Sequence, residues 1–105
     1  MIARVVTYDG PVSSDLAGVR MYEESALPWL REATGFRGLV VLVDRANERT
    51  LALSFWTDEE AERESEAARR GFGELVAERV GLERDDGRLY EVVLARGVEG
   101  EWPPA

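Results

Sequence analysis

The sequence predicts an α+β fold of the ferredoxin-like kind, in which a four-stranded antiparallel sheet carries two helices on one face. Strand-like segments rich in β-branched and apolar residues open the chain, form a pair in its middle and return near its end. Two longer segments with helical spacing separate them. The resulting order, β-α-β-β-α-β, defines the split βαβ arrangement. The length of 105 residues suits a single domain.

The first strand and the first helix are predicted from residues 2–35. Ile2–Tyr8 has the β-branched and aromatic composition of a strand. Pro28 should kink the helix that follows, and Gly35 should end it. The caps offered to this helix are Ser13, Ser14 and Asp15. Its apolar stripe comprises Leu16, Val19, Tyr22, Ala26, Leu30 and Ala33.

The central strands are predicted over Leu39–Arg45 and Thr50–Trp56, with a short turn between them. Leu39–Arg45 is apolar on both faces, which is typical of a strand covered on both sides. The two faces of the next strand differ. One carries Leu51, Leu53 and Phe55, and the other carries Thr50, Ala52, Ser54 and Trp56. Small residues on the second face leave room for helix packing, the commoner case, or for a ligand.

A second helix and a last strand complete the predicted domain. Thr57 and Glu60 have the spacing of a capping box, and Gly71 and Gly73 should weaken the helix after it. The predicted inner face of this helix comprises Ala61, Ser65, Ala68, Phe72, Leu75 and Val76. Leu89–Ala95 is the expected fourth strand. The domain is therefore assigned to residues 1–96, and a tail containing Trp102-Pro103-Pro104 to residues 97–105.

Apolar residues on both faces of the sheet predict a homodimer. Helices can cover only one face, yet Val5 and Val6, and likewise Val92 and Val93, place apolar side chains on opposite faces of their strands. Large exposed apolar surfaces mark interfaces. We expect two copies to pack sheet against sheet.

The composition excludes several kinds of chemistry. The chain has no Cys and no His, and all 13 basic residues are Arg against 21 acidic residues. Disulfides, thiol nucleophiles, lysine Schiff bases and histidine-ligated metals or haem are therefore excluded. A Mg²⁺ or Ca²⁺ site made of carboxylates remains open, but no loop has its pattern. We expect no cofactor and no metal.

Charge and hydropathy indicate where the protein works. A net charge of −8 opposes binding to nucleic acid or to an anionic membrane surface. The longest aliphatic run, Leu39–Val43, is too short to span a bilayer. The first residues lack the layout of a signal peptide, so the cytoplasm is the expected location.

Three local patterns have ordinary interpretations. Residues 70–73, Arg-Gly-Phe-Gly, match the start of an RNA-recognition signature, but Glu74 and Ala77 occupy positions where aromatic residues should stack on bases. The Gly-x-x-Gly of residues 35–38 is better read as a turn. The acidic run of residues 58–66 is interpreted as a helix start followed by a solvated face, rather than as a metal or acid site.

The candidate ligand-binding residues gather around the end of the third strand. Trp56 lies beside small residues there and is either a core residue or the wall of a pocket. Ser54 shares its face, and Tyr8, Tyr22 and Trp29 lie at or near the stripe that should face the sheet. These residues would form an aromatic-walled pocket between sheet and helix, although ordinary core packing is an alternative for each aromatic residue.

The motifs of the central region resemble the antibiotic biosynthesis monooxygenase family of dimeric α+β barrels. They are Gly-Phe-Arg-Gly at residues 35–38, the strand at residues 39–44, and Leu-Ser-Phe-Trp-Thr-Asp-Glu-Glu-Ala at residues 53–61, with Ser65 beyond. The resemblance implies two ferredoxin-like subunits joined through their sheets. It also implies a site between sheet and helices that includes Trp56.

Members of this family have several activities, and this sequence lacks residues that some of those activities use. The family includes cofactor-independent oxygenases of aromatic polyketides, haem-degrading oxygenases and quinol oxygenases. Haem degraders use an Asn on the first strand and a His after the Trp, but this chain has residues 6–8 without Asn and Glu66 at those places. The polyketide oxygenases tend to use an Asn beside the Trp, whereas Asn47 lies in a turn. Haem degradation is therefore not expected.

Together these observations predict a homodimer that oxidises a small aromatic, polyketide-like or quinol substrate with O₂ and without a cofactor. Tyr8, Tyr22 or Ser54 could orient a phenol, and Arg4 or Arg20 could stabilise its anion. A non-catalytic dimer that binds a small ligand or serves a structural role is the alternative. An isomerase or a lactone-handling enzyme is a third hypothesis, because one fold hosts many reactions.

Overall fold

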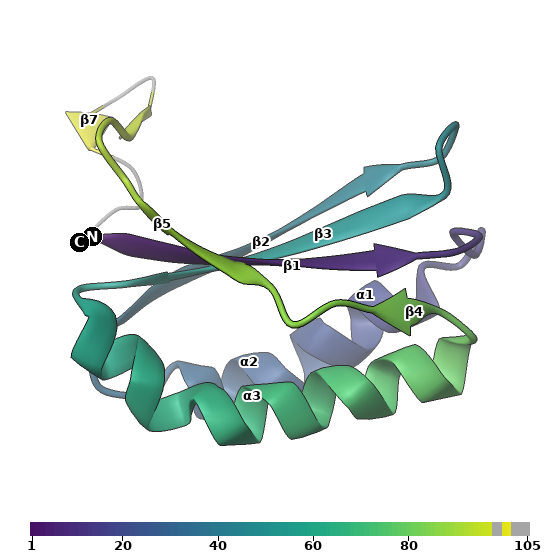
Figure 1. The fold of residues 1–105 in the computed structure, drawn as a ribbon, viewed down its shortest axis with the longest axis horizontal. Coiled ribbons are helices and arrows are strands. Elements are labelled where there is room, and N and C mark those ends of the chain that lie inside the picture. The colour runs from purple at the N-terminus through teal and green to yellow at the C-terminus, as the bar shows by residue number, and fades with distance from the viewer. Residues whose placement is uncertain (98–99, 102–105) are drawn as a thin grey trace.

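The structure is a computed structural model that describes residues 1–97 and 100–101. Its main sheet has the order β2–β3–β1–β4, with β5 also paired to β1, and every pairing is antiparallel. The strands are β1 (Ile2–Asp9), β2 (Phe36–Asp44), β3 (Arg49–Trp56), β4 (Glu83–Arg84) and β5 (Arg88–Glu91). All helices lie on one face of this sheet (Figure 1). The predicted ferredoxin-like fold is confirmed.

The first helical segment contains a widened turn. It comprises α1 (Ala17–Met21), the π-helical η1 (Tyr22–Ala26) and α2 (Leu27–Leu30). The N-cap of α1 is Leu16, so the predicted caps Ser13, Ser14 and Asp15 are wrong. Ser13 Oγ and Asp15 Oδ1 instead accept from the N–H of Ala17 from outside the helix, both at 3.2 Å. Pro28 lacks an N–H, and the helix widens just before it, where Leu27 N–H reaches back to Tyr22 O. The segment ends at Leu30, before Gly35.

The second helix, α3 (Glu59–Val80), begins on a different cap from the predicted one. Asp58 accepts a hydrogen bond from Ala61 N at 2.8 Å, and the N–H of Thr57 is donated to Gly35 O at 2.9 Å. The predicted Thr57 capping box is therefore wrong, because Thr57 still pairs with the segment before β2. The helix also continues through Gly71 and Gly73 without a break.

The inner face of α3 is rotated from the predicted one. Its buried residues are Ala61, Glu62, Gly73, Val76 and Ala77. Leu75, which was placed on this face, is 42% exposed, and Ala68 is exposed as well. Glu62 is only 2% exposed, so one member of the acidic run is not solvated.

The fourth strand is wrong in position. Residues 83–91 supply it as the two short strands β4 and β5, and residues 92–95 lie outside any strand. The side chain of Asp85 accepts from Thr7 N at 2.9 Å and from Gly87 N at 3.0 Å, so a side chain interrupts the backbone ladder. Beyond it, β6 (Arg96–Gly97) and β7 (Gly100–Glu101) form a separate ribbon. The Trp102-Pro103-Pro104 segment lies outside the described residues.

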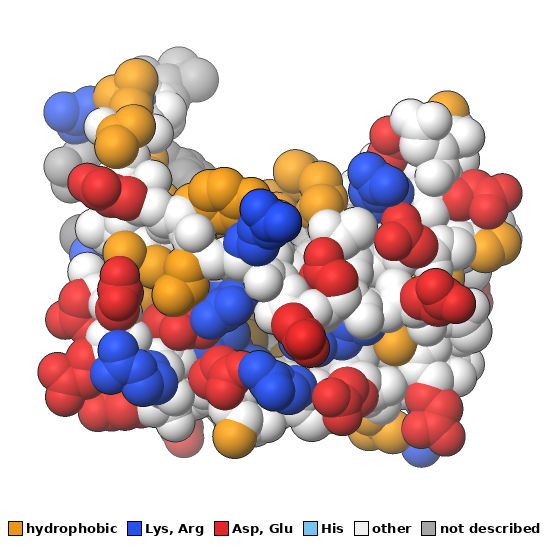
Figure 2. Space-filling view, viewed as in Figure 1, with side chains coloured by type: hydrophobic (Ala, Val, Ile, Leu, Met, Phe, Trp, Pro, Cys, Tyr) orange, Lys and Arg blue, Asp and Glu red, His pale blue; other side chains and the backbone are white. Residues whose placement is uncertain are grey.

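The two faces of the sheet are unequal. The largest fully buried side chains, Trp56, Tyr8 and Leu30, lie between sheet and helices. The register places Val5, Val40 and Leu53 together on the opposite face, which no helix of the described residues covers. Leu42 on that face is 48% exposed. Figure 2 shows hydrophobic side chains in the hollow between the β2–β3 hairpin and the C-terminal ribbon. Within the described part of the chain, no helix is long and apolar enough to cross a membrane.

Gly73 allows the side chains of Arg84 and Tyr8 to lie close to α3, whereas no neighbour lies that close to Gly71. A Cβ at Gly73 would overlap Arg84 Nε and lie 2.9 Å from the Tyr8 hydroxyl, whereas a Cβ at Gly71 would meet nothing within 4 Å. We expect Gly73→Ala to lower the free energy of unfolding by about 2 kcal/mol through overpacking. Gly71→Ala should raise it by up to about 1 kcal/mol through helix propensity. Urea denaturation of both variants checks this, and equal effects of the two substitutions would contradict it.

Candidate active site

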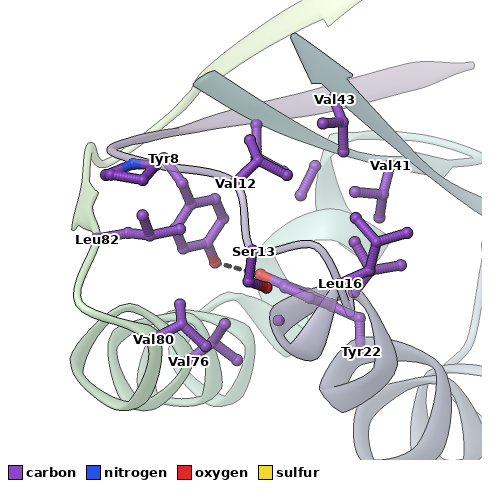
Figure 3. Close-up of a pocket in the computed structure, with 15 residues that line it drawn as sticks. Tyr8, Val12, Ser13, Leu16, Tyr22, Val41, Val43, Val76, Val80 and Leu82 are labelled. Atoms are coloured by element: carbon purple, nitrogen blue, oxygen red, sulfur yellow. Dashed lines mark hydrogen bonds between the residues drawn. The ribbon is translucent and has the colours of Figure 1, made fainter. Parts of the chain in front are cut away.

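A first cavity lies between the sheet and the ends of α1 and α3 (Figure 3). Its wall is mostly aliphatic. It is lined by Tyr8, Pro11, Val12, Ser13, Leu16, Gly18, Val19, Tyr22, Val41, Val43, Thr50, Ala52, Val76, Val80 and Leu82. Figure 3 shows the hydroxyls of Tyr8 and Tyr22 meeting at one side of it. The cavity therefore suits an apolar group and offers few polar contacts.

A second cavity adjoins the first, because Tyr22 and Ala52 line both. Its lining is richer in aromatic and cationic groups. It comprises Arg4, Val6, Tyr22, Ala26, Trp29, Leu30, Leu39, Ala52, Ser54, Arg69, Phe72 and Arg84. Aromatic walls combined with a few polar groups that fix orientation are typical of small-molecule sites.

A tyrosine pair stands where the two cavities meet. The hydroxyls of Tyr8 and Tyr22 are hydrogen-bonded, and their rings meet edge to face with centroids 6.3 Å apart. Phe72 holds the Tyr22 ring from another side, at 5.2 Å between centroids. Burial, followed by the neighbouring Tyr8, raises the pKa of Tyr22 far above its ordinary value of 10.0. Tyr22 thus stays neutral and acts as a hydrogen-bond donor or acceptor rather than as a base.

Ser54 carries the hydroxyl that faces the second cavity from the sheet. The indole Nε1 of Trp56 donates to Ser54 Oγ at 2.9 Å, and both residues are buried. Because Oγ accepts from the indole, its own proton is directed elsewhere. Trp56 itself is 0% exposed and lines neither of these cavities. It lies behind Ser54, between Phe36 and Arg69. The centroids of the Phe36 and Trp56 rings are 5.4 Å apart, and the guanidinium carbon of Arg69 lies 4.9 Å from the centroid of the Trp56 ring.

A buried carboxylate links two of the cationic residues in this wall. Glu62 Oε1 accepts from Arg4 Nε at 2.9 Å and from Arg69 Nη2 at 2.6 Å. Arg69 is held further by its own bond from Nε to Ser65 Oγ at 3.0 Å. Burial would raise the pKa of Glu62, but the hydrogen bonds from Arg4 and Arg69 outweigh it and hold that pKa below its ordinary value. Glu62 is therefore ionised at neutral pH.

The structure brings most of the predicted site residues together. Tyr22, Trp29 and Ser54 line the second cavity, and Tyr8 lines the first. Trp56 supports Ser54 from behind. Of the two cations proposed to stabilise an anion, Arg4 faces the second cavity. Arg20 lies at the surface, with its side chain 63% exposed and 3.6 Å from Asp15.

Sequence reasoning missed Glu62, Arg69 and Arg84. The spacing of three and four residues that joins Glu62, Ser65, Arg69, Gly73 and Val76 was a signal for the first two, because it places them on one helix face. Arg84 had no such signal, since the fourth strand was expected later in the chain. Among the described residues, no group of three or more acidic side chains is arranged to hold a metal ion.

Comparison with known proteins gives a likeness of fold. No protein-family model matches the sequence, and no curated protein matches it. Among solved structures, the chain is similar to a monooxygenase from the gene ActVA-Orf6 of Streptomyces coelicolor, determined in complex with the ligand nanaomycin D. The TM-score is 0.65 at 21% identity, covering 90% of this chain and 88% of that chain. The chain thus shares the ferredoxin-like fold of that monooxygenase, which is the fold that the sequence resemblance implied.

Proposed function

We propose that this protein is a homodimeric monooxygenase that oxidises a small aromatic, polyketide-like or quinol substrate with O₂ and without a cofactor. The observation that carries the proposal is the aromatic-walled second cavity, which lies between sheet and helices in a chain with the fold of a monooxygenase. Ser54 and Tyr22 supply hydroxyls to this cavity, and Arg4 supplies positive charge.

The proposed reaction draws its electrons from the substrate. In an anthrone-like substrate, the activated methylene carbon loses a proton to solvent water and the resulting carbanion is delocalised onto oxygen. This anion transfers electrons to O₂, a C–O bond forms, and the peroxide takes a proton back from water to give a hydroperoxide. Loss of water from the hydroperoxide then leaves a carbonyl, so one oxygen atom enters the product and the other leaves as water. Fixed donors and positive charge near the developing oxyanion favour the first step.

The chain's own residues would act by binding and orientation. Trp29 and Phe72 provide aromatic surfaces for a flat ring, and the Ser54 hydroxyl can donate to a substrate oxygen. Tyr22 is neutral, because burial holds its pKa far above the ordinary value. Its hydroxyl can accept from the substrate, or donate to it when Tyr8 is the donor in their shared hydrogen bond. Substrate that fills the cavity would displace water and strengthen each of these interactions.

Oxygen uptake by the purified protein tests the proposal. The panel consists of anthrones, naphthols and hydroquinones, each compared with the buffer rate. We expect catalysed uptake with at least one class of substrate, and Tyr22→Phe should reduce that uptake about tenfold through loss of one hydrogen-bond donor. Absence of catalysed uptake across the panel would contradict the oxygenase proposal.

A ligand-binding dimer without catalysis is the second candidate. The observation in its favour is that the residues facing the second cavity include no group suited to act as a base, since the chain has no His and Tyr22 is held neutral. Binding of a panel compound with no oxygen uptake would support this candidate.

The homodimer is proposed to form through the sheet face that carries Leu42. We expect Leu42→Glu to shift the protein toward a monomer in analytical ultracentrifugation, because it places a charge within an apolar interface. Leu75→Glu is the matched control. Leu75 and Leu42 are similarly exposed, at 42% and 48%, but Leu75 lies on α3, away from the proposed interface. A wild-type protein that sediments as a monomer, or equal effects of the two variants, would overturn the proposed interface.

A further inference from the structure

Arg84 has a buried donor without an acceptor. Its side chain lines the second cavity, and its Nε–H has no hydrogen-bond partner within the described part of the chain. A buried N–H that lacks a partner is costly, especially on a charged group. The side chain nevertheless has space made for it, because Gly73 lacks the Cβ that would overlap Nε. A ligand that supplies an acceptor would remove this cost.

The surroundings of Arg84 are positively charged. Three guanidinium groups, those of Arg4, Arg69 and Arg84, line the second cavity. Glu62 neutralises one unit of that charge, through bonds at 2.9 Å to Arg4 and 2.6 Å to Arg69. No carboxylate lies among the described residues that line this cavity. This positive charge contrasts with the net charge of −8 of the whole chain.

Arg4 and Arg69 are already committed to protein acceptors. Arg69 donates to Ser65 Oγ, to Glu62 O and to Glu62 Oε1, and its guanidinium lies against the Trp56 ring. Arg4 donates through Nε to the same carboxylate. Among the described residues, Arg84 is therefore the guanidinium of this cavity that pairs with no carboxylate of the chain.

We propose that the second cavity binds an aromatic carboxylate, whose carboxylate pairs with the guanidinium of Arg84. Nε–H and the adjacent Nη–H of arginine form a fork that matches the two oxygens of a carboxylate. Trp29 and Phe72, in the same wall, supply the surface for the aromatic ring. This inference deepens the proposed function by naming its substrate class, and it rests on that function only in taking this cavity as the substrate site.

Isothermal titration calorimetry with 2-naphthoate and its uncharged methyl ester tests the proposal. We expect the wild type to bind the acid about tenfold or more tightly than the ester. Arg84→Met should lose this preference and bind both compounds alike. Arg20→Met, which removes an exposed arginine, should keep the wild-type preference. Arg84→Met should also keep the wild-type Tm, because it removes an unpaired donor.

The other results of these experiments either overturn the proposed anion site or separate it from the oxygenase proposal. Equal binding of acid and ester by the wild type, or unchanged binding of the acid by Arg84→Met, overturns the proposal. If Arg84→Met does not fold, Arg84→Lys replaces it; Lys keeps the charge but lacks the fork, and an unchanged affinity for the acid would again overturn the proposal. Selective binding of the acid without oxygen uptake in the panel would sustain the anion site while contradicting the oxygenase.

Discussion

Glu62→Ala is expected to lower the free energy of unfolding by about 3 kcal/mol, because it leaves two partly buried guanidiniums without their carboxylate. The Glu62 side chain is 3% exposed, and those of Arg4 and Arg69 are 17% and 12% exposed, so water cannot replace the lost partner fully. Urea denaturation at neutral pH measures the change. Glu64→Ala is the control, since Glu64 lies exposed on the same helix, and it should change stability by less than about 0.5 kcal/mol.

The difference in stability between the wild type and Glu62→Ala is expected to depend on pH. Because the folded-state pKa of Glu62 lies below the ordinary value of 4.5, its ionised form stabilises the fold above that pH. This contribution is lost as the pH falls through the lower, folded-state pKa. The gap in stability between the wild type and Glu62→Ala should therefore narrow on acidification from pH 4.5 downwards. A gap that stays constant or widens would contradict the ion-pair account.

Trp56→Ala should cost about 4 kcal/mol of stability, because it empties a fully buried site and removes the donor to Ser54. Trp56→Phe should cost less, since it keeps a ring against Phe36 but loses the indole N–H. Trp56 lies behind Ser54 and lines neither cavity. We therefore expect Trp56→Phe to lower the Tm clearly and to change the KM for a substrate little. Thermal denaturation and oxygen uptake of the same samples separate the two effects.

The opposite ranking would return Trp56 to the pocket wall. If Trp56→Phe kept the wild-type Tm but raised KM strongly, substrate would have to reach the indole directly. The matched comparison is Trp29→Phe, because Trp29 does line the second cavity and is only partly buried. For Trp29→Phe we expect a clear rise in KM and little loss of stability.

Patterns of apolar residues predicted most of the fold, because they report burial directly. The alternation in Thr50–Trp56 placed Ala52, Ser54 and Trp56 on one face, and all are buried toward the helices. The fourth strand was missed because Asp85 satisfies backbone N–H groups with its side chain. That leaves the exposed Val93 and Leu94, whose composition is typical of a strand, beyond the last pairing in the main sheet.

The hydroxyl and aromatic groups of the candidate site and the charge of Arg4 were predicted from the sequence, whereas Glu62, Arg69 and Arg84 were not. Tyr22 and Ser54 follow from helical and strand periodicity, which aim both at the space between the layers. Glu62 was interpreted as solvated because it belongs to the acidic run of residues 58–66, which has Arg63, Arg69 and Arg70 nearby. Its burial depends on Arg4, a residue 58 positions away along the chain, and such a pairing becomes visible only once β1 and α3 are placed side by side.

The central claim is that oxidation takes place in the space between sheet and helices, and filling that space tests it most directly. Ala52 lines both cavities, so Ala52→Leu should obstruct both. With a substrate found in the oxygen-uptake panel, we expect this folded variant to lose at least about nine-tenths of the wild-type rate. Ala67→Leu, on the exposed side of α3, should keep that rate. Undiminished uptake by a folded Ala52→Leu protein would place the reaction elsewhere and contradict the account.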